Sequence, residues 1–171
     1  MVLDFGGLKS PLFNISNISG QGLAGNSSQS VLNEESDVGV IYAELSDWQG
    51  SAIFEAGLGA AYLVDGNVAT NGGGNAVGDY ATFTFAGITK FKRWRQYGDT
   101  ANSGVAGVFN VQYLSPNSGL YVDWFTFETL DSNTWSSYTN VTEIRTSRIK
   151  ITCTTVNGSG TNYIGELEII Y

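Results

Sequence analysis

Short segments in which apolar and polar residues alternate recur along the C-terminal two-thirds of the chain. Tyr80–Phe85, Phe109–Tyr113 and Arg148–Cys153 follow this pattern, and Glu166–Tyr171 alternates charged residues with Leu and Ile. Val122–Phe127 is a dense aromatic run. Because successive side chains of a strand point to opposite faces of a sheet, each segment is predicted to form a β-strand.

Turn-forming residues separate these segments. Clusters of Gly, Asn, Ser and Pro occur at 71–75, 98–104, 115–119, 131–133 and 157–160. Regular spacing of short strands and turns is typical of a β-sandwich or jelly roll. The predicted fold class is therefore all-β, an antiparallel β-sandwich with an N-terminal extension. The best helix candidate, Val38–Leu45, is equally compatible with a strand.

The first 50 residues have a different composition. Residues 14–30 are rich in Asn, Ser, Gly and Gln and contain few large apolar side chains. The length of 171 residues fits one domain. We therefore expect residues 1–50 to form an extended arm or irregular extension and residues 51–171 to form the sandwich.

The net charge of −8 argues against nucleic acid as a partner, because phosphate contacts need a basic surface. The basic residues of the C-terminal half form two clusters, at residues 90–95 and 145–150. These clusters are compatible with two solvated strand edges, where Lys and Arg protect against aggregation. They are also compatible with one positive patch for an anionic ligand or subunit.

The single cysteine, Cys153, excludes an intrachain disulfide, and its place beside Ile149 and Ile151 in an alternating segment predicts a buried thiol. The opening Met1–Gly6 lacks a basic stretch followed by an apolar one, so no secretory signal is expected. No apolar run approaches the roughly 18 residues of a membrane span. We therefore expect the protein on a virion or particle surface, or in the cytoplasm of the cell that makes it.

Six segments follow one another in a recognisable order from about residue 58. The first, Ala61–Thr70, reads A-Y-L-V-D-G-N-V-A-T, and the others are Tyr80–Gly87, Ile88–Arg95, Phe109–Ser115, Ile144–Ile151 and Ile164–Tyr171. In this order they resemble the A-x-x-x-x-D-G-N-x-x-T loop and the strands of discoidin-like (galactose-binding-like) domains and related carbohydrate-binding modules. The resemblance implies a galactose-binding-domain-like jelly roll over about residues 58–171. Two features depart from the family pattern: Phe85-Ala86 replaces a strand-ending Asp-Leu, and Tyr121–Leu130 is an aromatic insertion.

Many members of this family hold a structural Ca²⁺ beside the D-G-N-x-x-T loop. By motif position, the resemblance implies that Asp65 and Thr70 supply side-chain oxygens, Asn67 a carbonyl and Glu166 a carboxylate. Such a set of oxygen donors suits Ca²⁺. The alternative is an Asp-Gly turn in which Asp65 bonds its own backbone. No other cofactor is expected.

Residues suited to catalysis are scarce. The chain contains no His and one Cys, which excludes Ser-His-Asp and Cys-His arrangements and argues against a zinc site. Glu166 and Glu168 share one strand face about 6–7 Å apart, a separation that overlaps that of glycosidase carboxylates. An outward Glu-x-Glu on a terminal strand is usually a solvated face, so we expect no enzymatic activity.

Exposed aromatic rings are the expected ligand contacts, because sugars stack on them. Trp94 is flanked by Arg93 and Arg95, a combination suited to an acidic or sulfated sugar. Most Trp side chains of a sandwich belong to its core, so only one or two should be exposed. The candidate ligand-binding residues are Arg93, Trp94, Arg95, Tyr97, Trp124 and Trp135, with Trp48 and Tyr121 as further aromatic candidates.

Two functions fit this sequence. The first is a non-catalytic structural, decoration, adaptor or fibre-associated subunit of a phage or virus particle, or of a similar assembly. Such a subunit would bind other protein subunits through a polar N-terminal arm that folds on binding. The second is a carbohydrate-binding module that recognises a cell-surface or polysaccharide glycan. The first is favoured because the chain reads as one domain without a linker to an enzyme or a secretory signal.

Overall fold

A computed structural model describes residues 39–74, 76–100, 106–156 and 162–171. The chain divides into two units, Met1–Glu35 and Ser36–Tyr171, and the described residues belong to the second. Most of the predicted N-terminal arm, up to residue 38, therefore lies outside the described residues.

The described part of the chain consists mainly of β-strands. Each of the five segments predicted from its side-chain pattern lies within a strand, with Tyr171 just beyond the last one. The elements are β1 (Ile41–Tyr42), α1 (Leu45–Gln49), β2 (Ala52–Ala56), the 3₁₀-helix η1 (Ala60–Leu63), β3 (Tyr80–Tyr97), β4 (Val108–Leu114), β5 (Tyr121–Glu128), β6 (Thr139–Thr155) and β7 (Glu166–Ile170). Val38–Leu45, ambiguous in sequence, contains β1 and the first residue of α1.

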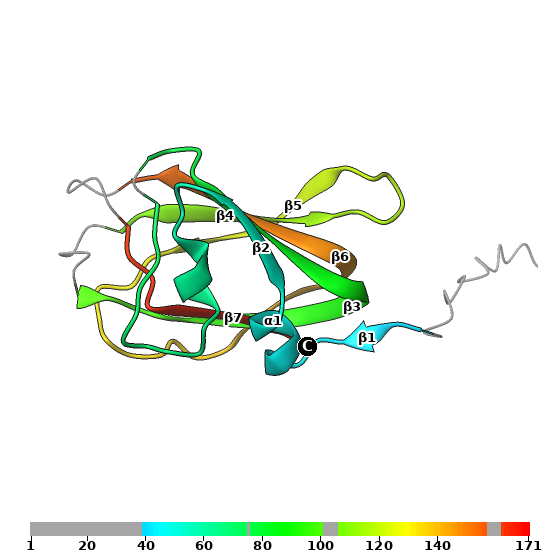
Figure 1. The fold of residues 1–171 in the computed structure, drawn as a ribbon, viewed down its shortest axis with the longest axis horizontal. Helices are drawn as coiled ribbons and strands as arrows, with labels where there is room; N and C mark the ends of the chain where they lie inside the picture. The colour runs from blue at the N-terminus through cyan, green and yellow to red at the C-terminus, as the bar shows by residue number, and fades with distance from the viewer. Residues whose placement is uncertain (1–38, 75, 101–105, 157–161) are drawn as a thin grey trace, which may run out of the picture. The chain divides into compact units, whose positions relative to one another are not determined.

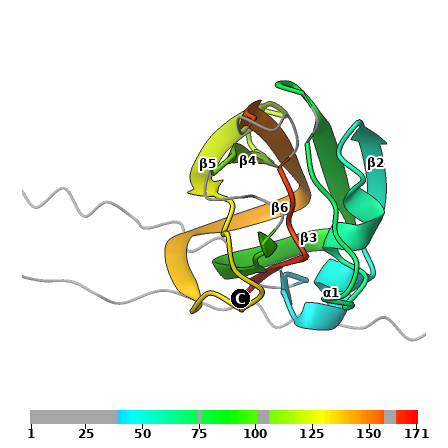
Figure 2. The same cartoon turned by 90° about the vertical axis from the view of Figure 1, so that its left-hand side faces the viewer.

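The long strands β3 and β6 organise the fold. They pair with each other along most of their length, with register shifts between Thr84 and Thr89 and between Phe91 and Arg93. The first half of β3 is flanked by β2, and the second half pairs with β1 and β7. β6 in turn carries β4, and β4 carries β5. Figures 1 and 2 show β3 and β6 bending across the molecule, so that one hydrogen-bonded network supplies both layers.

This arrangement confirms the predicted antiparallel β-sandwich. Among the described strands, the short pairing of β1 with β3 is the parallel exception.

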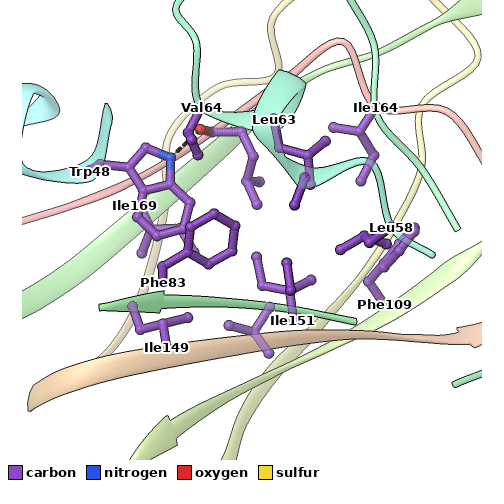
Figure 3. Close-up of a cluster of buried hydrophobic side chains, with 14 of the residues drawn as sticks. Trp48, Leu58, Leu63, Val64, Phe83, Phe109, Ile149, Ile151, Ile164 and Ile169 are labelled. Carbon is purple, nitrogen blue, oxygen red and sulfur yellow. Dashed lines mark hydrogen bonds between the residues drawn. The ribbon is translucent and has the colours of Figure 1, made fainter. Parts of the chain in front are cut away.

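Alternating side chains from both layers fill the core (Figure 3). Phe83 of β3, Phe109 of β4 and Ile151 of β6 are fully buried, and Ile169 of β7 meets them from the other layer. Cys153 is a buried free thiol, as its place beside Ile149 and Ile151 predicted. The period of two along each strand therefore explains which side chains fill the core.

Residues 41–49 pack on the sandwich. The Trp48 side chain is fully buried, its ring centroid lies 4.6 Å from that of Phe83, and its Nε1 donates to the carbonyl oxygen of Leu167. The sequence-based boundary had assigned this segment to the extension, because a five-residue helix is too short to show a period. The division at residue 50 itself stays a prediction, since residues 1–38 lie outside the description.

The two basic clusters lie on the neighbouring strands β3 and β6, where Lys90 is the cross-strand partner of Arg145. Residues 90–95 lie on an interior strand, which does not fit the interpretation as a strand edge. Arg145 and the exposed Arg148 lie where β6 pairs with β3 but not with β4, which fits it. Lys90 is only 5% exposed and lies 3.5 Å from Glu143. Several cations lie over aromatic rings at 4.2–5.8 Å from the ring centre: Lys90 over Tyr42, Lys92 over Tyr171, Arg93 over Tyr138, Arg95 over Trp135 and Tyr138, and Lys150 over Tyr80 and Tyr121.

The burial of Trp48 predicts that Trp48→Ala lowers the free energy of unfolding by about 3–5 kcal/mol, because it leaves a large cavity and an unpaired carbonyl. Urea unfolding followed by far-UV circular dichroism measures this loss. Val77→Ala is the control, since Val77 is 65% exposed and the change should cost less than about 0.5 kcal/mol. Equal stability of the two variants would contradict the packing of residues 41–49 on the core.

Candidate functional site

Strand alternation separates the predicted ligand-binding residues of β3. Arg93, Arg95 and Tyr97 share one face of the strand, whereas Trp94 points to the other. The Trp94 ring is partly buried against the core and packs on Phe125 and Phe127 at centroid distances of 5.1 and 4.9 Å. Trp94 therefore does not share a surface with the arginines that flank it in sequence.

The other face of β3 carries a ladder of rings and guanidinium groups. The Arg95 guanidinium lies between Trp135, at 4.2 Å, and Tyr138, at 4.4 Å from the ring centres. Arg93 lies over Tyr138 at 4.9 Å, and Tyr97 meets Trp135 edge-on at 5.5 Å. Four of the six predicted ligand-binding residues thus meet in one cluster, and Tyr138 joins them.

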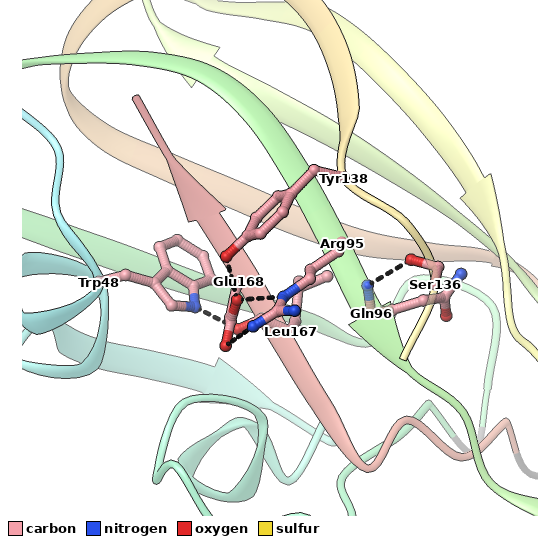
Figure 4. Close-up of polar contacts among 7 residues, drawn as sticks. All are labelled: Trp48, Arg95, Gln96, Ser136, Tyr138, Leu167 and Glu168. Atoms are coloured by element: carbon pink, nitrogen blue, oxygen red, sulfur yellow. Dashed lines mark hydrogen bonds and ion pairs between the residues drawn. The ribbon is translucent and has the colours of Figure 1, made fainter. Parts of the chain in front are cut away.

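Glu168 of β7 occupies the centre of this cluster (Figure 4). Arg95 donates to both of its carboxylate oxygens, at 2.5 and 3.1 Å, and the Tyr138 hydroxyl donates to one of them. The carboxylate bonds raise the pKa of Arg95, because they favour the charged guanidinium. The polar groups of this cluster therefore satisfy one another and hold the segment before β6 against β3.

Backbone contacts hold the same segment on β3. The Gln96 amide donates to the Ser136 hydroxyl, and the Ser136 amide donates to the Gln96 carbonyl oxygen. The Arg95–Glu168 cluster is thus held together by its own polar contacts, with Tyr138 37% exposed.

Glu166, two residues before Glu168, is buried with no such partner. It is 1% exposed, and neither of its carboxylate oxygens has a hydrogen-bond partner of normal distance and angle among the described residues. Burial raises the pKa of Glu166 to about 8; the Gly66 amide opposes this rise, and the nearby charge of Asp65 adds to it. The prediction of an outward, solvated Glu-x-Glu face is therefore wrong, because both carboxylates lie under other parts of the chain.

Several oxygen atoms lie close together in the 65–70 loop, which covers Glu166. The Thr70 hydroxyl donates to Asp65 Oδ2 at 2.8 Å and to the Asn67 carbonyl oxygen at 2.7 Å. Asp65 Oδ1 accepts from the Asn67 amide at 2.8 Å, which is the Asp turn of the alternative interpretation. The turn and the predicted Ca²⁺ ligands are therefore compatible with each other.

These groups fit a Ca²⁺ ion. Two carboxylates and neutral oxygens are suitable donors, and Glu166 is a buried acid without a hydrogen-bond partner. Within the described ranges, no three His, Cys, Asp or Glu side chains come together as a metal-binding group, so neutral oxygens would have to complete the set.

A hollow of about 230 Å³ lies among the loops that follow β2 and precede β3 and β7. We call it the loop-end hollow; its lining residues are Gly57, Gly59, Tyr62, Asn71, Gly72, Gly73 and Tyr163. Tyr62 is 51% exposed, and the Asn71 amide donates to the Asp99 carboxylate at 2.7 Å. Tyr62, Tyr163 and Asn71, whose amide is held by the Asp99 carboxylate, thus line one opening.

Backbone hydrogen bonds hold the hollow in shape. Gly72 and Ile164 exchange two bonds at 2.8 and 2.9 Å, and the Gly73 amide donates to the Leu58 carbonyl oxygen at 2.8 Å. A Cβ atom on Gly73 would lie 1.5 Å from the Asn162 carbonyl oxygen, so only glycine allows this close approach. The site is therefore preformed from segments that are far apart in sequence.

Sequence reasoning did not identify Tyr62, Asn71, Asp99 or Tyr163, because they lie in the short η1 or in loops, which show no periodic pattern. The cluster of glycines at 72–74 was the available signal, since such a run permits close backbone packing. Trp124, the remaining predicted residue, lies on β5, where its Nε1 donates to the Thr142 carbonyl oxygen at 2.7 Å.

Among the described residues, no helix has the length and apolar character needed to cross a membrane.

No family model matches the chain, and no curated protein matches its sequence. Solved structures do match. The chain is similar to CpGH89CBM32-5 from Clostridium perfringens in complex with GalNAc-β-1,3-galactose, with 11% identity, a TM-score of 0.59 and coverage of 73% of this chain and 99% of that one. It is similar to the family 32 carbohydrate-binding module of C. perfringens NanJ in complex with galactose, with 14% identity, a TM-score of 0.56 and coverage of 77% and 100%.

A third similar structure is a truncated AlyQ with CBM32 and alginate lyase domains, at 20% identity and a TM-score of 0.57. The match covers 70% of this chain but only 31% of the AlyQ chain. At these identities the likeness concerns the fold, which is the discoidin-like, galactose-binding β-sandwich that the motif order predicted. The matched carbohydrate-binding modules are non-catalytic, although some matched chains are parts of enzymes.

The Arg95–Glu168 pair generates a prediction about stability. Arg95→Ala should lower the free energy of unfolding by about 2–3 kcal/mol, because it leaves the buried Glu168 carboxylate without its cation. The expected loss of stability is smaller than for a fully buried ion pair, since the Arg95 side chain is 27% exposed. Chemical denaturation at neutral pH measures the loss. Arg93→Ala on the same face is the matched control and should cost at most about 1 kcal/mol; an equal loss in both variants would contradict the assigned role of Arg95.

Proposed function

We propose that this chain is a non-catalytic carbohydrate-binding module and that the loop-end hollow holds a sugar. The observation that carries this proposal is the preformed opening between Tyr62 and Tyr163. Several solved structures with the same fold are carbohydrate-binding modules, two of them described in complex with galactose or a galactose-containing disaccharide.

The chemistry of the hollow suits a sugar. Phenol rings offer apolar faces to the C–H groups of a pyranose, and their hydroxyls remain in water. Asn71, held by its bond to Asp99, supplies an amide oxygen that can accept from a sugar hydroxyl. The volume of about 230 Å³ lies below the roughly 300–1,000 Å³ of sites for drug-sized ligands, which favours a single terminal sugar ring.

Binding without catalysis fits the positions of the acidic pair. Glu168 is neutralised by Arg95 and Tyr138, and Glu166 lies under the Asp65 loop. A glycosidase needs two carboxylates on either side of a bound glycosidic bond. Neither Glu166 nor Glu168 lines the loop-end hollow.

The virion-subunit hypothesis has less support. Its proposed contact with other subunits relies on the N-terminal arm, most of which lies outside the described residues. The similar structures point to sugar binding and none to a phage or virus particle. Assembly through the arm and a location on a particle therefore stay predictions.

We also propose that Asp65, Asn67, Thr70 and Glu166 hold a structural Ca²⁺. The ion would neutralise the buried Glu166 carboxylate, just as Arg95 neutralises Glu168. It would also hold the 65–70 loop, which connects η1 to the segment lining the loop-end hollow.

The sugar site generates a binding prediction. The full chain on a glycan array should bind galactose-terminated glycans, and Tyr62→Ala should weaken binding roughly two- to tenfold, because a stacked ring contributes about 0.5–1.5 kcal/mol. Tyr42→Ala is the control, since Tyr42 is similarly exposed but lies outside the hollow. Absence of binding to any glycan at high protein concentration would overturn the proposed function.

The calcium site generates a prediction about pH. In EGTA, the Glu166 contribution to stability is fully present below about pH 4.5 and is lost as pH rises through about 8, because its folded-state pKa is raised. The free energy of unfolding falls by at most about 1.4 kcal/mol for each pH unit between these two pH values. Adding Ca²⁺ at about 100 times its Kd should raise the melting temperature by roughly 5–10 °C at pH 8.

Glu166→Gln is the test variant, since it should abolish both the Ca²⁺ response and this pH dependence. Glu128→Gln, an exposed acid on β5, is the control and should change neither. A melting temperature of the wild-type chain that is equal in Ca²⁺ and EGTA across this pH range would contradict the calcium proposal.

A further inference from the structure

A second hollow, of about 450 Å³, lies on the exposed face formed by β4 and β5. Its lining residues are Asn110, Asp123, Trp124, Phe125, Thr126 and Thr154. None of them lines the loop-end hollow. The volume lies within the roughly 300–1,000 Å³ typical of small-molecule sites, and we call this surface the β4–β5 platform.

Three polar side chains of the two strands are fixed against one another beside the platform. Asp123 Oδ1 accepts from the amide groups of Asn110 at 2.7 Å and of Gln112 at 2.8 Å. These two hydrogen bonds lower the pKa of Asp123, because they favour its charged form. The carboxylate is therefore ionised at neutral pH and held by two neighbours.

The amides keep further hydrogen-bonding groups. Asn110 and Gln112 each give one N–H group to Asp123. Their carbonyl oxygens, their second N–H groups and Asp123 Oδ2 can still form hydrogen bonds. Beside the platform there are therefore both acceptors and donors, which suits sugar hydroxyls.

A β-bulge places aromatic rings beside these acceptors. The register of β4 and β5 shifts between Val111 and Gln112, which leaves Trp124 outside the regular pairing. Bulges of this kind re-aim side chains at the edge of a sheet. The bond from Trp124 Nε1 to Thr142 and the edge-on contact with Phe125 at 4.9 Å hold the indole in place.

We propose that the β4–β5 platform is a second glycan-binding surface that takes an internal segment of a neutral sugar chain. Sugar hydroxyls would donate to the Asn110, Gln112 and Asp123 oxygens, and the apolar face of a ring would pack on Trp124. The ionised Asp123 repels carboxylate and sulfate groups, which selects neutral over acidic chains. The inference rests on the proposed function for the class of ligand but on different residues for the site.

Affinity electrophoresis of the full chain tests this proposal. Native gels would contain galactan, galactomannan or xyloglucan as neutral probes and polygalacturonate or alginate as acidic ones. The wild type should be retarded by at least one neutral polysaccharide. Asp123→Ala should weaken that retardation at least fivefold in apparent Kd, since it removes a charged acceptor for a sugar hydroxyl.

Glu128→Ala is the matched control, an exposed carboxylate on the same strand but outside the platform, and should bind as the wild type does. Melting temperatures verify that both variants are folded. Asp123→Ala should also keep the wild-type response to galactose-terminated glycans on the array, because these bind at the loop-end hollow.

The outcomes separate the two proposals. Equal retardation of wild type and Asp123→Ala by a neutral polysaccharide overturns the platform alone. Retardation of the wild type by acidic polysaccharides only also overturns the platform. Failure of the wild type to bind any polysaccharide or arrayed glycan overturns the proposed function as well.

Discussion

The last strand, β7, carries two buried carboxylates, Glu166 and Glu168, on the face opposite its core residues Leu167 and Ile169, and other segments of the chain cover them. A buried carboxylate is costly unless a cation or several hydrogen bonds stabilise it. Glu168 is stabilised by Arg95 of β3 and by Tyr138 from the segment before β6. Glu166 lies against the loop that contains Asp65 and Gly66. Glu166 at the start of β7 and Glu168 in its middle therefore connect distant segments through electrostatics as well as through packing.

The position of β7 connects the buried Glu166 carboxylate to the proposed sugar site. Gly72 exchanges backbone hydrogen bonds with Ile164, just before β7, and the Gly165 amide donates to the Tyr97 carbonyl oxygen. Backbone hydrogen bonds thus connect Gly72, which lines the loop-end hollow, to the segment that leads into β7 and Glu166. Neutralisation of Glu166 would stabilise the lining of the hollow without contacting a sugar, which is how a structural ion assists a binding module.

Much of the fold was predictable, because the alternation of side chains in β3, β4, β6 and β7 reflects a core on one side of each strand. The same rule implies that Trp94 and Arg95 point in opposite directions, and the interpretation of Trp94 as a ligand contact did not apply it. The meeting of Arg95 with Trp135 and Tyr138 could not be predicted, since it depends on how a loop about 40 residues away packs against β3. The burial of Glu166 and Glu168 was hidden for the same reason: their partners come from other segments.

The central claim is that the sandwich binds a sugar among the loops that surround Tyr62 and Tyr163. Titration of the ¹⁵N-labelled chain with galactose, followed by ¹H–¹⁵N correlation spectra, tests it most directly. The account predicts saturable shifts of the amides at residues 57–73 and 162–165, with the Arg95–Glu168 cluster unchanged. Spectra without saturable changes, or with changes confined to residues 93–97 and 135–138, would contradict it.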